Sequence, residues 1–500
     1  MAPDHDEVPA SASSPPPGDS RTTGDAMPPG DSGPAYRTVS WAESFRTWCR
    51  VAALSFGGPA GQIAVMHRII VDEKKWLNEE RFLHALNYCM LLPGPEAQQL
   101  ATYIGWLMHG TRGGLMAGTL FILPGFVAIL VLSVLYAQFK QTAFLDSLLF
   151  GLKAAVLAVV VEAVLRIGRR VLKNRVMVAL AIAAFIGIFF FGLPFPVIIL
   201  AAALAGFIGG HLAPDKFAPV KHGGGAKSTA GGKDAGATGA ETEQREPPPL
   251  KLHDNPPPTW GRALRVSSVC LTLWFGPLLL VYATLGRDSV LAREGEFFSQ
   301  MAVVTFGGAY SVLSYVAQQA VETHHWLQPR EMLDGLGMAE TTPGPLIMVV
   351  QFVGFLGAYR APSPFSPLVA GLLGSVLTTW VTFVPCFYWI FLGAPYVERL
   401  RGNRLLNASL TAITAAVTGV VLNLAVWFSL HTLFAHVREW RPLGLRLLVP
   451  EWSTLQPAAC LLAVVALLLT FVARRGLAAT LLICCGLGIA IRYVGALLGS

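Results

Sequence analysis

The sequence contains few charged residues. Asp, Glu, Lys and Arg make up only 13% of its 500 residues, whereas 53% are hydrophobic. A soluble domain carries roughly 25% charged residues, so the composition excludes an ordinary water-soluble globular protein. The formal net charge of +7 at pH 7 comes without a basic face interleaved with aromatic residues, and nucleic acid is therefore not an expected partner.

The sequence also lacks the motifs of catalysis and metal binding. It contains no Walker A, HExxH or GxSxG motif, which argues against ATP hydrolysis, zinc peptidase chemistry and a serine hydrolase. Its seven cysteines form no CxxC pair and no His/Cys spacing typical of a metal site. We therefore predict that the protein is not an enzyme and needs neither a cofactor nor a metal.

Long apolar runs dominate what the sequence does contain. They include residues 115–135, 176–210, 266–285, 368–392 and 457–472. About 20 apolar residues cross a hydrocarbon core of roughly 30 Å as a helix, and no alternating strand pattern appears. We predict an all-α polytopic protein of the plasma (inner) membrane.

Two polar stretches divide the chain. Residues 1–40, rich in Pro, Ser and Gly, are predicted to be a disordered tail, without the basic start and apolar core of a signal peptide. Residues 213–259, with two Pro triplets, are predicted to be a disordered cytoplasmic linker. We assign 41–212 to an N-terminal repeat, 260–288 to an extra linking transmembrane helix and 289–500 to a C-terminal repeat.

The repeat assignment depends on three motifs at a constant offset of 250 (306−56, 326−76, 343−93). The pairs are Phe56-Gly57-Gly58 with Phe306-Gly307-Gly308, Trp76-Leu77 with Trp326-Leu327, and Pro93-Gly94-Pro95 with Pro343-Gly344-Pro345. Three motifs in one ungapped register are hard to attribute to chance.

The loop charges indicate that the second half is inverted. The turn at 192–196 has no charged residue, whereas the corresponding turn in the second half contains Arg474-Arg475. The positive-inside rule places these turns on opposite sides, with the basic cluster at 166–175 inside. We predict two homologous halves, arranged as inverted-topology repeats, because such halves can exchange conformations in alternating access.

The Pro-Gly-Pro motifs interrupt apolar stretches in both halves. Pro removes a backbone donor and Gly lowers helicity, and an interrupted backbone persists in the bilayer only where protein or a cavity surrounds it. We therefore predict broken or re-entrant helices near 81–92 and 96–109. The free N–H groups after each motif attract anions, and two such helix N-termini meeting near the midplane are the predicted anion site. A loop is expected at Arg112-Gly-Gly114, and Trp76 and Trp326 are expected at the membrane interface.

Residues in and beside these breaks are the candidate contacts. Gln and Thr can donate to an oxyanion, and Arg68 can pair with a dianion in bidentate fashion or snorkel to the interface. Glu96, Glu340 and Lys153 are coupling candidates, because ionisable groups inside membranes are usually functional. The predicted substrate-binding residues are Phe56, Gly57, Gly58, Gln62, Arg68, Pro93, Gly94, Pro95, Gln98, Gln99, Phe306, Gly307, Gly308, Thr341, Thr342, Pro343, Gly344 and Pro345.

This series of motifs resembles the chromate ion transporter family in its long-chain, two-domain form. The first half carries Phe56-Gly-Gly-Pro59, Leu92-Pro-Gly-Pro95 and Phe121-Ile-Leu-Pro-Gly125, and the second half carries Thr342-Pro-Gly-Pro345. The resemblance covers roughly 40–210 and 290–498. It implies export of chromate, a tetrahedral dianion that mimics sulfate, and hence chromate resistance. The long tail and the long linker depart from the family's pattern. Glu96 puts a negative charge near the predicted anion site, as a proton-coupled group or as the sign of a different substrate in this member.

Three functions are compatible with these observations. The leading one is a secondary transporter, with antiport in exchange for protons as one form, that moves chromate or a related oxyanion such as sulfate. The alternatives are an anion channel and a non-transporting membrane scaffold. The lipid bilayer is an expected partner, while proton coupling and a homodimer stay open.

Overall fold

The computed structural model describes residues 38–56, 58–217, 259–306, 308–396 and 404–498. Most of the predicted tail (1–40) and linker (213–259) lies outside these residues. The first half contains α1 (Trp41–Leu54), α2 (Gly58–His67), α3 (Glu79–Cys89), α4 (Glu96–Phe139), α5 (Ala143–Val171), α6 (Arg175–Phe191) and α7 (Phe195–Leu212). The second contains α8 (Trp260–Leu285), α9 (Val290–Val304), α10 (Ala309–Ala317), α11 (Pro329–Thr341), α12 (Val349–Arg360), α13 (Pro367–Gly393), α15 (Arg404–Leu433), α16 (Pro457–Leu467) and α17 (Leu477–Leu498).

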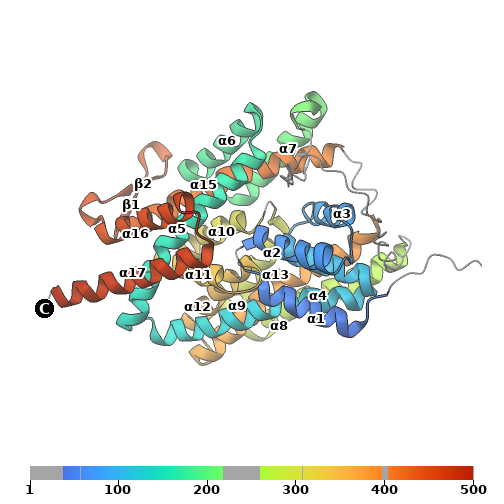
Figure 1. The fold of residues 1–500 in the computed structure, drawn as a ribbon, viewed down its shortest axis with the longest axis horizontal. Coiled ribbons are helices and arrows are strands. Elements are labelled where there is room, and N and C mark those ends of the chain that lie inside the picture. Colours follow the sequence, from blue (N-terminus) through green and yellow to red (C-terminus); the bar gives the residue numbers. More distant parts are fainter. Residues whose placement is uncertain (1–37, 57, 218–258, 307, 397–403, 499–500) are drawn as a thin grey trace, which may run out of the picture.

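The described chain is almost entirely helical, as predicted. Its sheet is one antiparallel hairpin, β1 (Val437–Trp440) with β2 (Leu447–Pro450). Among the described helices, seven are long and apolar enough to cross a membrane, and three shorter helices are also apolar. The protein is therefore a multi-pass membrane protein. Figure 1 shows α6 and α7 along one side of the molecule, with α1, α4, α8 and α9 along the other.

The helix α4 is a hairpin of two antiparallel arms. The backbone leaves helical geometry at His109 and Gly110, where Gly110 has φ +62°. A Cβ atom on Gly105 would lie 2.4 Å from the carbonyl oxygen of Gly113, so the two arms touch through small residues. The predicted loop at Arg112-Gly-Gly114 is wrong, because these residues are helical and the chain turns earlier. The equivalent helices α12 and α13 are separated by a true loop.

Short half helices precede each Pro-Gly-Pro motif. The side chain of Asn78 accepts a hydrogen bond from the amide of Arg81 at 2.9 Å and begins α3. A capping box of Gln328 and Glu331 begins α11. These caps satisfy backbone N–H groups at the helix starts, where Asn78 and Gln328 are exposed, and they fix where the half helices begin.

A π-helical turn precedes each of the two tryptophans that the 250-residue offset pairs. The turns are Arg68–Glu73 and Gln318–Thr323, and the amides of Trp76 and Trp326 bond back into them. Both indole side chains are buried in the protein. The prediction that they face the membrane interface is wrong, because both indoles are packed inside the protein, where Trp326 stacks on His324 and Phe298.

The two halves run in opposite directions. The start of α5 and the end of α15 line one cavity, through Lys153 and His431 for example. The other ends of these helices share a core cluster through Val171 and Ala408. Because α5 and α15 occupy equivalent places in the two repeats and are antiparallel, the predicted inverted repeat is confirmed.

The halves are also interlocked. The helix α5 packs against α16 and α17, while α15 packs against α6 and α7. A Cβ atom on Gly151 would lie 2.0 Å from the carbonyl oxygen of Cys484, and one on Gly419 would lie 2.0 Å from that of Ala181. Small residues allow this close approach of helix backbones in membranes, so each half completes the packing of the other.

Candidate functional site

The four broken-helix motifs meet in crossed pairs. The amide of Gly94 donates to the carbonyl oxygen of Thr305 at 2.9 Å, and the amide of Gly344 donates to that of Ser55 at 2.9 Å. Thr305 and Ser55 immediately precede the two Phe-Gly-Gly motifs. Each Pro-Gly-Pro turn is therefore bound to the Phe-Gly-Gly motif of the opposite half, and the two bonds are related by the repeat. We call this region the crossed-motif centre.

Glycine is required at both turns. Gly94 has φ +123° and Gly344 has φ +104°, a region that L side chains rarely adopt. A Cβ atom on Gly94 would lie 2.9 Å from Cys386 Sγ, and one on Gly344 would lie 3.1 Å from the backbone of Gly125. Gly125 and Cys386 each follow the proline inside a long helix of the opposite half. Both turns are thus closed in by backbone and side chains of the other repeat.

The helix that follows the first turn is polar at its N-terminus. Gln98 and Gln99 are fully buried, and Gln99 Nε2 donates to the carbonyl oxygen of Pro93 at 2.7 Å. The Oε1 atoms of both glutamines have no hydrogen-bond partner among the described residues. Pro95 begins this helix as its cap and is buried. Unpaired buried polar atoms are costly, and a bound water or ion is one explanation for them.

The second turn is followed by apolar residues. Pro345 leads into a 3₁₀ turn, Leu346–Met348, before α12, and the described N-terminus of α12 is buried and apolar. Pro93 and Pro343 are partly buried. The sequence predicted two equivalent helix N-termini, and the structure brings together one polar and one apolar end.

Two buried groups link the second turn to the rest of the crossed-motif centre. Gln62 Nε2 donates to the carbonyl oxygen of Gly344 at 2.6 Å. The hydroxyl of Tyr310 donates to Glu340 Oε1 at 2.7 Å, and Glu340 Oε2 has no hydrogen-bond partner among the described residues. Glu96 is partly buried and lies within electrostatic reach of Arg170.

The remaining predicted substrate contacts differ in how far they are buried in the protein. Phe56 is 45% exposed and Phe306 is partly buried. The hydroxyls of Thr341 and Thr342 donate to carbonyl oxygens of their own helix, at 2.8 and 3.2 Å. Gly58 and Gly308 have positive φ values, while Gly57 and Gly307 lie outside the described residues.

Arg68 lies away from the centre. Its side chain is 56% exposed and lies 3.7 Å from Glu73. The π-helical turn directs this residue outward, so the structure does not bring it together with the Pro-Gly-Pro turns. The exposed position of Arg68 favours snorkelling to the membrane interface over contact with a substrate.

Lys153 forms a buried ion pair that the sequence analysis missed. Its Nζ lies 3.1 Å from Asp334 Oδ1, and the side chains are 16% and 3% exposed. The hydroxyl of Tyr136 donates to Asp334 Oδ2 at 2.9 Å. The sequence signal was Asp334 itself, a carboxylate in the short helix before the second Pro-Gly-Pro motif. Its partners, Lys153 and Tyr136, are too distant in sequence to be identified from it.

Cavities open at both ends of α5. One of about 570 Å³ is lined by Lys153, Asp334 and Arg492 among others. Another of about 340 Å³ is lined by Arg166, Arg474 and Tyr310 among others. The first cavity is lined by residues of the N-terminal part of α5, and the second by residues of its C-terminal part together with Tyr310, which is bonded to Glu340.

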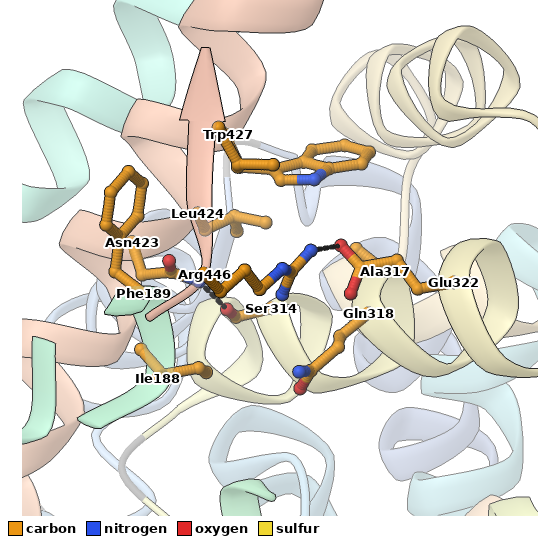
Figure 2. Close-up of a pocket in the computed structure, with 11 residues that line it drawn as sticks. Ile188, Phe189, Ser314, Ala317, Gln318, Glu322, Asn423, Leu424, Trp427 and Arg446 are labelled. Carbon is orange, nitrogen blue, oxygen red and sulfur yellow. Dashed lines mark hydrogen bonds and ion pairs between the residues drawn. The ribbon is translucent and has the colours of Figure 1, made fainter. Parts of the chain in front are cut away.

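A smaller hollow beside α10 is occupied by a salt bridge (Figure 2). Arg446 Nη2 lies 2.5 Å from Glu322 Oε1, and Asn423 Nδ2 donates to Ser314 Oγ at 3.4 Å. The amide of Arg446 donates to the carbonyl oxygen of Phe190 at 2.6 Å. This arginine joins the β-hairpin to the π-helical turn and to the end of α6, so its contacts are structural.

Comparison with known proteins identifies relatives over most of the chain. The chromate transporter family matches residues 42–207 and 295–490. A chromate transport protein of Pseudomonas aeruginosa is 29% identical over 80% of this chain and 82% of its own length. One from Cupriavidus metallidurans is 25% identical over 75% of this chain and 80% of its own length. An uncharacterized transporter of Methanocaldococcus jannaschii is 23% identical over 77% of this chain and 84% of its own length. No solved structure matches the chain.

Proposed function

The chain belongs to the chromate transporter family, and from this premise we propose that it is a secondary transporter for chromate or a related tetrahedral oxyanion such as sulfate. We propose that it acts in the plasma membrane and exports its substrate, which would confer chromate resistance. Family membership supports the substrate class, and the crossed-motif centre supports the mechanism.

The proposed binding site is the polar N-terminus of α4. Backbone N–H groups after Pro95 carry partial positive charge, and the amide nitrogens of the buried Gln98 and Gln99 are donors in the same turn. In the structure Gln98 Nε2 donates to Thr102 and Gln99 Nε2 to Pro93, so binding would require both amide groups to exchange these partners for the anion. Donors held in a water-poor interior bind an anion strongly, because the low dielectric leaves its charge unscreened.

Alternating access would use the inverted repeat. In one state the crossed bonds Gly94–Thr305 and Gly344–Ser55 hold the halves in the arrangement seen here. If the two halves exchange their conformations, the same four motifs form the opposite arrangement, and the crossed-motif centre becomes accessible from the other side of the membrane. The crossed pairs would then act as the pivot.

Proton coupling is proposed through Glu340, with Glu96 as the second candidate. Glu340 is buried, accepts one hydrogen bond from Tyr310 and has one unpaired oxygen. A buried carboxylate can gain a proton more easily than it can remain charged without a cation. Neutralising it would remove the repulsion that an entering dianion meets.

The experiment is the flux of radiolabelled chromate and sulfate in proteoliposomes, with and without a pH gradient. Concentrative, saturable flux that an uncoupler abolishes supports a proton-coupled carrier. Flux that only equilibrates the anion points to a channel instead. Absence of flux for both anions would overturn the proposed function.

A further inference from the structure

An arginine-rich cavity lies beside the C-terminal part of α5. Arg166 contributes from α5, and Arg474 and Arg475 contribute from the turn between α16 and α17. One carboxylate, Glu162, also lines it, so these side chains give the cavity a formal charge of +2. Its volume is about 340 Å³, enough for on the order of ten waters at about 30 Å³ each. A tetrahedral oxyanion fits with part of its hydration shell.

The three arginines differ in their ion pairing. Arg166 forms an ion pair with Glu162, one helical turn away. Neither Arg474 nor Arg475 has an ion-pair partner within the described part of the chain. Two guanidinium groups are therefore available, and the third is held by a carboxylate that a dianion can replace. Guanidinium forks match the oxygens of such anions in bidentate geometry.

The floor of this cavity touches the crossed-motif centre. Tyr310 lines the cavity, and its hydroxyl is bonded to Glu340, three residues before Pro343. A Cβ atom on Gly58 would lie 3.5 Å from the Tyr310 hydroxyl, so the first Phe-Gly-Gly motif borders the same side chain. The charge of Arg166 also acts on Glu340. Tyr310 thus lies between the arginines and two motifs, the first Phe-Gly-Gly and the second Pro-Gly-Pro.

We propose that this cavity is the cytoplasmic loading site for the oxyanion, with Arg166, Arg474 and Arg475 as its ligands. The anion replaces Glu162 on Arg166, and Tyr310 then passes it to the crossed-motif centre. The side is cytoplasmic because the positive-inside rule places both the basic cluster at 166–175 and the Arg474-Arg475 turn there. This proposal rests on the proposed transport function and adds three residues to it.

Glu162 separates this proposal from a purely structural explanation. An exposed i,i+4 ion pair contributes little to stability and nothing to transport. As a competitor for Arg166, however, Glu162 weakens anion binding. Replacing it should therefore improve loading, whereas replacing any of the arginines should impair it.

The test is the initial rate of radiolabelled sulfate flux against sulfate concentration, in proteoliposomes with the cytoplasmic face outward. We expect Arg166→Gln, and separately the double variant Arg474→Gln/Arg475→Gln, to raise KM about tenfold with Vmax within twofold of wild type. Glu162→Gln should lower KM at least twofold. Arg175→Gln is the matched control, because Arg175 is exposed at the start of α6 and lies outside the cavity lining.

The outcomes separate the loading site from the transport function. If the wild type moves no oxyanion, the transport function itself fails. If the wild type transports and the arginine variants keep its KM, only the loading site is overturned. Should an arginine variant not reach the liposomes, Glu162→Gln decides, because an unchanged or higher KM contradicts competition for Arg166.

Discussion

The amide of Gly344 donates a hydrogen bond to the carbonyl oxygen of Ser55 at 2.9 Å. The bond joins the second Pro-Gly-Pro turn to the residue before the first Phe-Gly-Gly motif, and its repeat equivalent joins Gly94 to Thr305. Both acceptors lie where a helix ends, so each break in one half satisfies a backbone group released by a break in the other. Each interrupted helix is therefore tied by a backbone hydrogen bond to an interrupted helix of the other half.

Replacing Gln62 with Leu tests whether its hydrogen bond stabilises the second Pro-Gly-Pro turn. Gln62 Nε2 is the side-chain donor to the carbonyl oxygen of Gly344, and removing it leaves a buried acceptor unpaired at a cost of about 1–3 kcal/mol. We expect a lower thermal unfolding midpoint and a loss of most chromate flux. Gln300→Leu is the control, since Gln300 is exposed. Equal effects of the two variants would refute the role given to Gln62.

Replacing Gly125 with Ala tests the close contact between α4 and the second turn. The new Cβ would lie 2.8 Å from the carbonyl oxygen of Pro343, and overpacking of this kind costs about 1–3 kcal/mol. We expect flux to fall about tenfold or more. Cys386→Ala, at the equivalent place in α13, only removes a sulfur atom and should keep most activity. Wild-type flux in Gly125→Ala would contradict the packing described here.

Lys153 and Asp334 form a pair that single substitutions should break. Removing one partner of a buried ion pair costs about 3–5 kcal/mol, whereas removing both is often tolerated. We expect Lys153→Met to reduce the amount of folded protein in fluorescence-detected gel filtration, and Lys153→Met/Asp334→Asn to restore it. If the double variant folds and its pH-driven flux equals that of the wild type, Lys153 is not a coupling residue. If it is as unstable as the single variant, the ion pair is not the reason for instability.

Glu340→Gln tests the proposed proton coupling. Glutamine still accepts the hydrogen bond from Tyr310 but cannot bind and release a proton. We expect exchange of labelled for unlabelled chromate to continue within a few-fold of wild type, while flux loses its response to the pH gradient. Glu96→Gln serves as the parallel variant. A retained pH response in both variants would exclude these two carboxylates as the coupling groups.

The sequence predicted the fold well because the repeat has a constant register. The offset that pairs Gly94 with Gly344 also pairs Ser55 with Thr305, and the antiparallel packing of α5 and α15 confirms the inversion inferred from loop charges. The broken helices follow from Pro and Gly chemistry alone. What the register could not predict is that each turn binds the motif of the opposite half, since this depends on how the halves pack.

Individual site residues were harder to predict. Arg68 follows the Phe-Gly-Gly motif closely in sequence, but the π-helical turn points it outward. Asp334 was missed because its partner, Lys153, lies in the other half of the chain. Tyr310 was missed because its hydrogen-bond partner, Glu340, lies in the next half helix and not in the same motif. Proximity in sequence is a poor guide here, because the bonds that join the motifs of the two halves, Gly94 to Thr305 and Gly344 to Ser55, connect residues far apart in the chain.

The most direct test of this account is chromate flux in everted vesicles from wild type, Gly94→Val and Gly344→Val. The matched control is Gly276→Val, because a Cβ atom there meets nothing within 4 Å. We predict that both motif variants reach the membrane but lose flux, with Gly94→Ala and Gly344→Ala impaired to a lesser degree, and that the control keeps its activity. Wild-type flux in both Gly94→Val and Gly344→Val would contradict the claim that the crossed motifs form the transport centre.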